Sequence, residues 1–328
     1  MRRRSWNGFS VTHCTRMAPD KFCHHVDIDT SLVHSKLAMN SNRSRPRWWL
    51  RITLAGAGAL LLGYLLLVLL TSPSNQRDWS PDQARMATSE VAGDMLKLRN
   101  VRNAVYRSTQ DYDVRWEDRS LDLRRLNSVW FVVEPFGKWR GPAHTLLSFG
   151  FDDGAYIAIS VEIRKQVHES FSPLLGLLRQ YELIYIVGDE RDLIGLRANH
   201  RRDQVYLYPI GTTPALMRAL LLSMLDRANA LALKPEFYNT LSNSCTSNIV
   251  DHIELIAPGR VPFSGKTLLP AYADDLAFDL GLIDSKLPRD RYREAHQIND
   301  LALAHADSED FSAGIRARMP HSTSVQSR

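Results

Sequence analysis

An uncharged apolar run, "ITLAGAGALLLGYLLLVLL" from Ile52 to Leu70, constrains this chain more than any other feature. It is long enough to cross a bilayer as one helix. Basic residues such as those of "RSRPRWW" crowd its N-terminal side, whereas "TSPSNQRDWSPDQ" after it holds a single arginine. The positive-inside rule therefore predicts a cytoplasmic N-terminus and exported residues from about 71 onward. In a bacterium this predicts a single-pass inner-membrane protein with a periplasmic C-terminal domain.

A cleavable signal peptide is the alternative, but the run is long for an h-region and no A-x-A-like site follows it. Residues 1–51 hold ten Lys and Arg against three acids, so the net charge of +5 comes from this tail and the rest of the chain is slightly acidic. This basic tail is a topology signal rather than a nucleic-acid surface. Residues 1–38 lack a periodic apolar pattern, and a start at Met39 would give a conventional short n-region. The "CHH" at 23–25 has no further ligand spacing, so we predict no metal site.

Beyond the apolar run we expect a linker at 71–94, one globular domain at 95–285 and a polar tail at 286–328. Period-two apolar runs bounded by turn residues predict strands, and three longer periodic runs predict helices. The result is an α+β domain with a mainly antiparallel sheet. The strands are expected at 129–136, 143–165 (a hairpin), 181–188 and 203–210, and the helices at 172–180, 213–231 and 246–257.

The hairpin brings a histidine and a carboxylate together. If Asp152 to Gly154 form the loop, with Gly154 at positive φ, the register places His144 opposite Glu162. The odd-numbered residues from Leu147 to Ile163 then form an unbroken apolar face, and the even-numbered ones, including Ser160, form the other. We expect Glu162 to hold the imidazole in one tautomer and to favour its protonated form. The alternative is a plain cross-strand ion pair on a solvated face.

Cys245 is the one cysteine of the exported part, so it has no disulfide partner there. Exported proteins tend to pair their cysteines or avoid them. It lies in the polar run "SNSCTSN", directly before a helix whose buried stripe is Ile249, Ile253 and Ile256. Backbone N–H groups and the helix dipole at such a position favour a thiolate and can also form an oxyanion hole. The alternative is a small buried hydrophobic residue.

Several motifs, in order along the chain, carry a family resemblance. They are "VRNAVY" at 101–106, "AHTLLSFGF" at 143–151, "ISVEIRK" at 159–165, "DLIGLRANHRRDQVYLYP" at 192–209 and "YNTLSNSCTSNI" at 238–249. Together they resemble the bacterial Lnb N-terminal periplasmic domain family over roughly 95–285. The order of a histidine on an early strand, then Asn-x-Cys opening a later helix, also resembles the circularly permuted, NlpC-type papain-like fold.

The resemblance implies a membrane-anchored lipoprotein N-acyltransferase that needs no cofactor. It would move an acyl chain from a phospholipid, through a Cys245 thioester, to the α-amine of a lipoprotein, with His144 as the base. Glu162 is the orienting group by the register argument, and Asn243, Thr246, Tyr238 and Ser160 are assigned to the oxyanion hole and pocket. The alternatives are a peptidoglycan-directed cysteine peptidase or amidase, and a non-catalytic envelope scaffold. No nucleic-acid partner is expected.

Overall fold

The computed structural model describes residues 47–136, 142–262, 270–283 and 287–319. The chain divides into two compact units, Met1–Ala59 and Leu60–Arg328. Helix α1 (Arg47–Leu70) contains the apolar run, and its segment Trp48–Leu70 is long and apolar enough to cross a membrane. The apolar side chains of α1 are unburied by protein, as expected of a lipid-facing helix.

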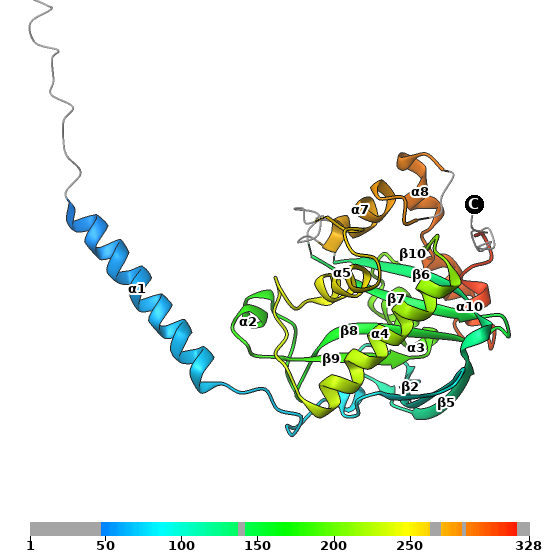
Figure 1. Ribbon diagram of the computed structural model, residues 1–328, viewed down its shortest axis with the longest axis horizontal. Coiled ribbons are helices and arrows are strands. Elements are labelled where there is room, and N and C mark those ends of the chain that lie inside the picture. Colours follow the sequence, from blue (N-terminus) through cyan, green and yellow to red (C-terminus); the bar gives the residue numbers. More distant parts are fainter. Residues whose placement is uncertain (1–46, 137–141, 263–269, 284–286, 320–328) are drawn as a thin grey trace, which may run out of the picture. The chain divides into compact units, whose positions relative to one another are not determined.

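The folded domain is built on an 8-stranded, mainly antiparallel sheet (Figure 1). The strand order is β1-β2-β9-β8-β7-β6-β10, with β5 pairing on β2, and β2 runs parallel to β9. The predicted α+β class with a mainly antiparallel sheet is therefore confirmed. The strands of this sheet are β1 (Thr88–Ala92), β2 (Met95–Arg102), β5 (Trp116–Asp122), β6 (Leu126–Pro135), β7 (Ala143–Phe151), β8 (Tyr156–Arg164), β9 (Glu182–Gly188) and β10 (Tyr206–Pro209), and a small second sheet pairs β3 (Val105–Tyr106) with β4 (Tyr112–Asp113).

The central hairpin of β7 and β8 has the predicted register. Leu146 pairs with Ser160, and the Phe151 amide donates to the Ala155 carbonyl at 2.9 Å across the turn. Gly154 has a φ of 84°, a value that glycine adopts without strain. Because the side-chain period of a strand is two, this register alone decides which residues share a face with His144.

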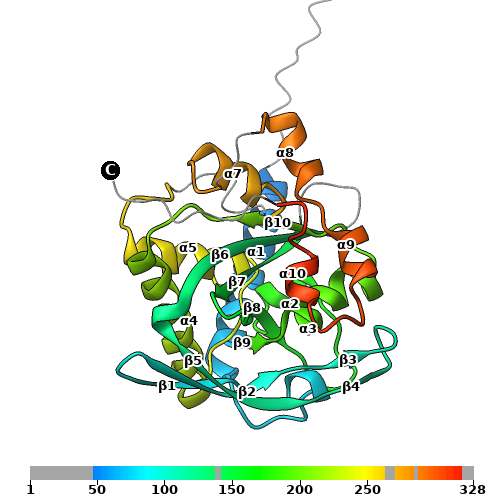
Figure 2. The same ribbon diagram turned by 90° about the vertical axis from the view of Figure 1, so that its right-hand side faces the viewer.

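Helices cover both faces of the sheet, with α4 and α5 on one side and α3, α9 and α10 on the other (Figure 2). The first layer buries the odd-numbered residues of the hairpin, and the second buries even-numbered ones such as Leu146 and Ala158. Because helices cover both faces of the sheet, polar side chains of its strands are buried together with the apolar ones. The helices are α2 (Pro173–Leu177), α3 (Glu190–Gly195), α4 (Pro214–Leu233), α5 (Cys245–Ile256), α7 (Ala273–Asp279), α8 (Arg289–Ala295), α9 (Asn299–Ala304) and α10 (Phe311–Gly314), with a π-helical turn at Leu196–Arg201.

The folded domain extends beyond the predicted 95–285 at both ends. Within the predicted linker 71–94, Trp79 is buried under the Arg164 guanidinium and β1 joins the sheet. Within the predicted polar tail 286–328, Phe311 is fully buried in the second layer. The C-terminal helices, Asn299–Ala304 and Phe311–Gly314, are too short to repeat an apolar period that would be visible in the sequence. Residues 1–46 and 320–328 lie outside the described residues.

Candidate functional site

Cys245 is the first residue of α5, and the residues around it determine where the preceding loop ends and the helix begins. Ser244 is the N-cap, and its hydroxyl accepts from the Ser247 amide while the Ser247 hydroxyl accepts from the Ser244 amide. This reciprocal capping box fixes where the helix begins. The thiol is free and buried, and its sulfur lies 3.8 Å from Thr246 Oγ1 and 4.0 Å from the Ala143 carbonyl oxygen.

His144, near the start of β7, is held by a short hydrogen-bond chain. Its Nε2 lies 2.7 Å from Ser160 Oγ, and the Ser160 hydroxyl donates to Glu162 Oε1 at 2.8 Å. Because the Ser160 proton points to Glu162, the Ser160 oxygen accepts from Nε2–H of the imidazole. Nδ1 of His144 therefore carries the lone pair, which is the arrangement required of a general base.

Glu162, beside His144 as predicted, is anchored by a buried arginine. Glu162 Oε1 lies 3.8 Å from His144 Nε2 and 2.7 Å from Arg197 Nη2, and Arg197 Nε lies 2.7 Å from Glu134 Oε2. Burial by itself raises the pKa of Glu162, but the charge of Arg197, with smaller contributions from His144 and other arginines, outweighs it and holds the pKa below its ordinary value. The Glu162 carboxylate, which ends this hydrogen-bond chain, is therefore ionised.

The imidazole itself is neutral, which corrects the expectation of a protonated His144. Burial, followed by the charge of Arg197, lowers the pKa of His144 to about 3, and Glu162 offsets only part of this. The expectation assumed that a neighbouring carboxylate would dominate, but that carboxylate is already neutralised by Arg197 and the imidazole is buried. The second face of the sheet is covered, so the alternative of a solvated ion pair is also wrong.

Cys245 and His144 line one cavity of about 330 Å³. Among the described residues no hydrogen bond joins His144 to the sulfur, whose polar contacts are Thr246 Oγ1 and the Ala143 carbonyl oxygen. The cavity lies at the start of β7, where Ala143 and His144 line it. Val161 and Ile163 line it from one face of the sheet, and Arg197 lines it from the other. A strand end is where side chains from opposite layers can meet.

The remaining predicted residues divide into two groups. Tyr238 lines the same cavity, and burial, with a smaller contribution from Cys245, raises the pKa of its hydroxyl, so it stays protonated. Thr246 Oγ1 lies 3.1 Å from Thr145 Oγ1 in the wall beside the thiol. The Asn243 amide instead serves the loop: it donates to the Phe237 carbonyl at 2.9 Å and accepts from Asn248 at 2.8 Å.

Arg197 and Glu134 belong to the site but were not predicted. Arg197 lies in the π-helical turn that continues α3, and such turns concentrate at functional sites. One signal was visible in the sequence, an arginine inside the apolar segment "DLIGLRAN", where a buried cation needs a buried partner. Which carboxylates neutralise it depends on strands that are distant in sequence.

Among the described residues, no group of three or more His, Cys, Asp or Glu side chains is placed to hold a metal ion. The Cys23-His24-His25 segment lies outside them. The chain is thus an α+β domain with a thiol and a neutral imidazole in one cavity, joined to a helix suited to cross a membrane.

Residues 112–271 match the model of the Lnb N-terminal periplasmic domain family. The protein is therefore periplasmic and membrane-associated, and the resemblance seen in the sequence motifs is confirmed. No curated protein and no solved structure matches the chain.

Proposed function

We propose that the protein is a thiol-dependent acyltransferase that moves an acyl chain from a phospholipid to the α-amine of a lipoprotein. One observation carries the proposal: the Cys245 thiol at the start of α5 shares a cavity with a neutral His144 whose Nδ1 is the unprotonated nitrogen. A nucleophile, a base and an orienting group on rigid elements are the parts that covalent acyl transfer needs.

In the first half-reaction His144 Nδ1 takes the Cys245 thiol proton. The thiolate sulfur attacks the ester carbonyl carbon of the phospholipid, and the oxyanion receives hydrogen bonds from backbone N–H groups of the first turn of α5, with the Tyr238 hydroxyl as a candidate further donor. The carbon–oxygen ester bond then breaks. The leaving alkoxide takes the proton from Nδ1, and lysophospholipid departs while the acyl group remains on Cys245 as a thioester.

In the second half-reaction the lipoprotein amine attacks the thioester carbonyl carbon. Nδ1 of His144 accepts a proton from the attacking nitrogen and then returns it to the departing Cys245 sulfur. The products are an N-acylated lipoprotein and free thiol. The Ser160–Glu162–Arg197 chain keeps the imidazole in one tautomer through both halves.

A lipid donor is favoured over a peptidoglycan peptide by what lies beside the thiol. A second cavity of about 420 Å³, lined mainly by apolar side chains, begins at Thr246, the residue that follows Cys245. A peptide amide placed there would lose hydrogen bonds to water without gaining many in return. The membrane-spanning segment α1 also keeps the domain beside lipid-borne substrates.

Intact-mass measurement of an acyl adduct tests the proposal. The purified full-length protein, incubated with phosphatidylethanolamine vesicles, should gain the mass of one acyl group and lose it when a diacylglyceryl lipopeptide with a free amine is added. Cys245→Ser should abolish the adduct, and His144→Gln should slow its formation by about a hundredfold or more. Absence of an adduct together with cleavage of soluble muropeptides would overturn the proposal in favour of a peptidase. Absence of both would favour a scaffold.

The topology we infer has the N-terminus in the cytoplasm and α1 in the inner membrane. Leu303 is 67% exposed on α9, so Leu303→Cys should react with a membrane-impermeant maleimide in cells with a permeabilised outer membrane. The tail cysteines Cys14 and Cys23 should stay unlabelled. Labelling of the tail alone would show the opposite orientation.

A further inference from the structure

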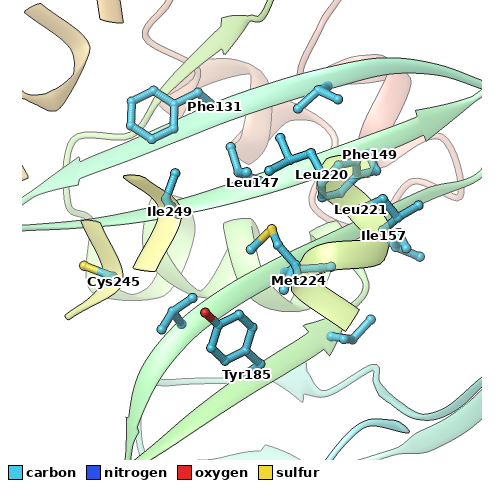
Figure 3. Packing of buried hydrophobic residues seen from close by; sticks show 14 of the residues in the cluster. Phe131, Leu147, Phe149, Ile157, Tyr185, Leu220, Leu221, Met224, Cys245 and Ile249 are labelled. Atoms are coloured by element: carbon cyan, nitrogen blue, oxygen red, sulfur yellow. The ribbon is translucent and has the colours of Figure 1, made fainter. Parts of the chain in front are cut away.

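The apolar cavity beside Thr246 is a separate space from the cavity that holds the catalytic groups. It lies between α5, α7 and the sheet strands β6 and β7, and it is lined among others by Phe131, Leu147, Ile249, Ile253, Ile256 and Ala277. Figure 3 shows Ile249 on α5, with Phe131 and Leu147 from the neighbouring strands near it. A cavity of about 420 Å³ lies within the ordinary range for small-molecule sites, roughly 300–1,000 Å³.

Two neighbouring pairs of residues mark the boundary between the cavities. Cys245 and His144 line the catalytic cavity, whereas the next residue of each segment, Thr246 and Thr145, lines the apolar one. The two threonine hydroxyls lie 3.1 Å apart and so satisfy each other in the dividing wall. The Cys245 sulfur is only 3.8 Å from Thr246 Oγ1. A group bonded to that sulfur therefore lies against the threonine pair, and an alkyl chain would pass this pair to reach the apolar cavity.

We propose that this apolar cavity holds the fatty acyl chain of the Cys245 thioester and selects its length. The inference rests on the proposed function and adds the part of the donor that is recognised. The carbonyl of the thioester stays on the polar side, where His144 and the α5 N-terminus lie, and the alkyl chain runs along α5 past Ile249 and Ile253. An apolar chain without side groups suits a lining whose polar members are mainly threonines.

The far end of the cavity defines the longest chain. Ile256 lies ten residues after Thr246, which is about 15 Å along a helix axis. Ala277 of α7 is buried and lines the same space, so a larger side chain there would reduce the volume left for the chain. Leu255, adjacent in sequence to Ile256, is 72% exposed on the outer face of α5 and is not part of the lining. It offers a matched control.

The test uses the full-length protein and an equimolar mixture of phosphatidylcholine vesicles with short or long saturated chains. The ratio of long-chain to short-chain adduct on Cys245, measured by intact mass, should fall about tenfold in Ala277→Phe. It should rise in Ile256→Ala and stay unchanged in Leu255→Ala. An adduct that forms with an unaltered ratio in both cavity variants would overturn the acyl site while leaving the transferase function in place.

A binding measurement tests the acyl-chain cavity independently of thioester formation on Cys245. Cys245→Ser cannot form a thioester, yet it should bind a fluorescent long-chain fatty acid, and adding Ala277→Phe should weaken that binding about tenfold. If this holds while the wild type forms no adduct, the cavity is an acyl site and the transferase proposal fails. Failure of the fatty acid to bind to folded Cys245→Ser, as judged by its thermal unfolding, would overturn the inference.

Discussion

At the scale of single residues, the site depends on how one imidazole is kept neutral and oriented. Burial lowers the pKa of His144, and Arg197 compensates the nearby carboxylate so that Glu162 cannot restore the proton. Ser160 lies between the two, and the direction of its proton decides which nitrogen of His144 is basic. The orienting role assigned to Glu162 therefore passes through a hydroxyl.

Ser160→Ala should remove this orientation with little effect on folding. Without the hydroxyl both tautomers of His144 become accessible, so we expect the rate of thioester formation to fall by about a hundredfold. Ser160→Thr, which keeps a hydroxyl, should recover much of the rate. Ser223→Ala is the control, because Ser223 Oγ lies 2.7 Å from Nδ1 of the equally buried His252, which does not line the catalytic cavity. An unchanged rate in Ser160→Ala would contradict an orienting role for the hydrogen-bond chain from His144 through Ser160 to Glu162.

The buried histidines also predict how stability depends on pH. Burial, followed by the charge of Arg227, lowers the pKa of His252 to about 4, against an ordinary value of 6.5. Above pH 6.5 the ring is neutral in both states and its titration contributes nothing. As the pH falls below this value the unfolded chain binds a proton that the folded protein does not, so the free energy of unfolding decreases by about 1.4 kcal/mol per pH unit for such a group.

His252→Gln should therefore flatten the loss of stability between pH 6 and about 4. The measurement is urea denaturation of the domain at several pH values, comparing slopes rather than absolute stabilities. Equal slopes in the two proteins would mean that His252 is protonated in the folded state.

At the scale of elements, α5 places the nucleophile through its first turn. The capping box at Ser244 and Ser247 ends the loop, and Asn248 continues the support, because Asn248 Nδ2 donates to the Ser244 carbonyl at 2.9 Å and Asn248 Oδ1 accepts from the Tyr185 hydroxyl. This cap leaves Cys245 at the first helical position. A shift of the start by one residue would turn the thiol by about 100° around the axis.

Ser244→Ala should lower the free energy of unfolding by about 1 kcal/mol, the usual cost of losing an N-cap side chain. Because the first turn would fray, thioester formation should slow as well. Ser242→Ala, an exposed change in the same loop, should alter neither. Denaturation and intact-mass kinetics on the three proteins make the comparison, and equal stabilities would show that the cap is dispensable.

At the scale of the whole domain, the second helical layer buries the face of the sheet that carries the site. α3 and its π-helical continuation bring Arg197 against the sheet, and α9 and α10 pack behind them through residues such as Ile298, Phe311 and Ile315. All three side chains are buried. The C-terminal segment therefore supports the face of the sheet on which His144 and Glu162 lie.

Phe311→Ala should destabilise the domain by about 3–5 kcal/mol, the range found when a buried aromatic ring is removed. Leu303→Ala on the exposed side of α9 should cost little. Thermal unfolding measures both. A small effect of Phe311→Ala would mean that the C-terminal layer is only loosely attached.

What the sequence by itself determined were the features that depend on neighbouring residues. The apolar run of α1, the register set by Asp152 to Gly154 and the helix start at Cys245 are local, because a turn glycine, a cap and an apolar period act over a few residues. The even face of the hairpin reads as polar in the sequence, and only the tertiary structure decided that it is buried. Arg197 and Phe311 reach it from segments far along the chain, and their burial and charge then decide that His144 is neutral, since the dielectric around a group is a property of everything packed against it.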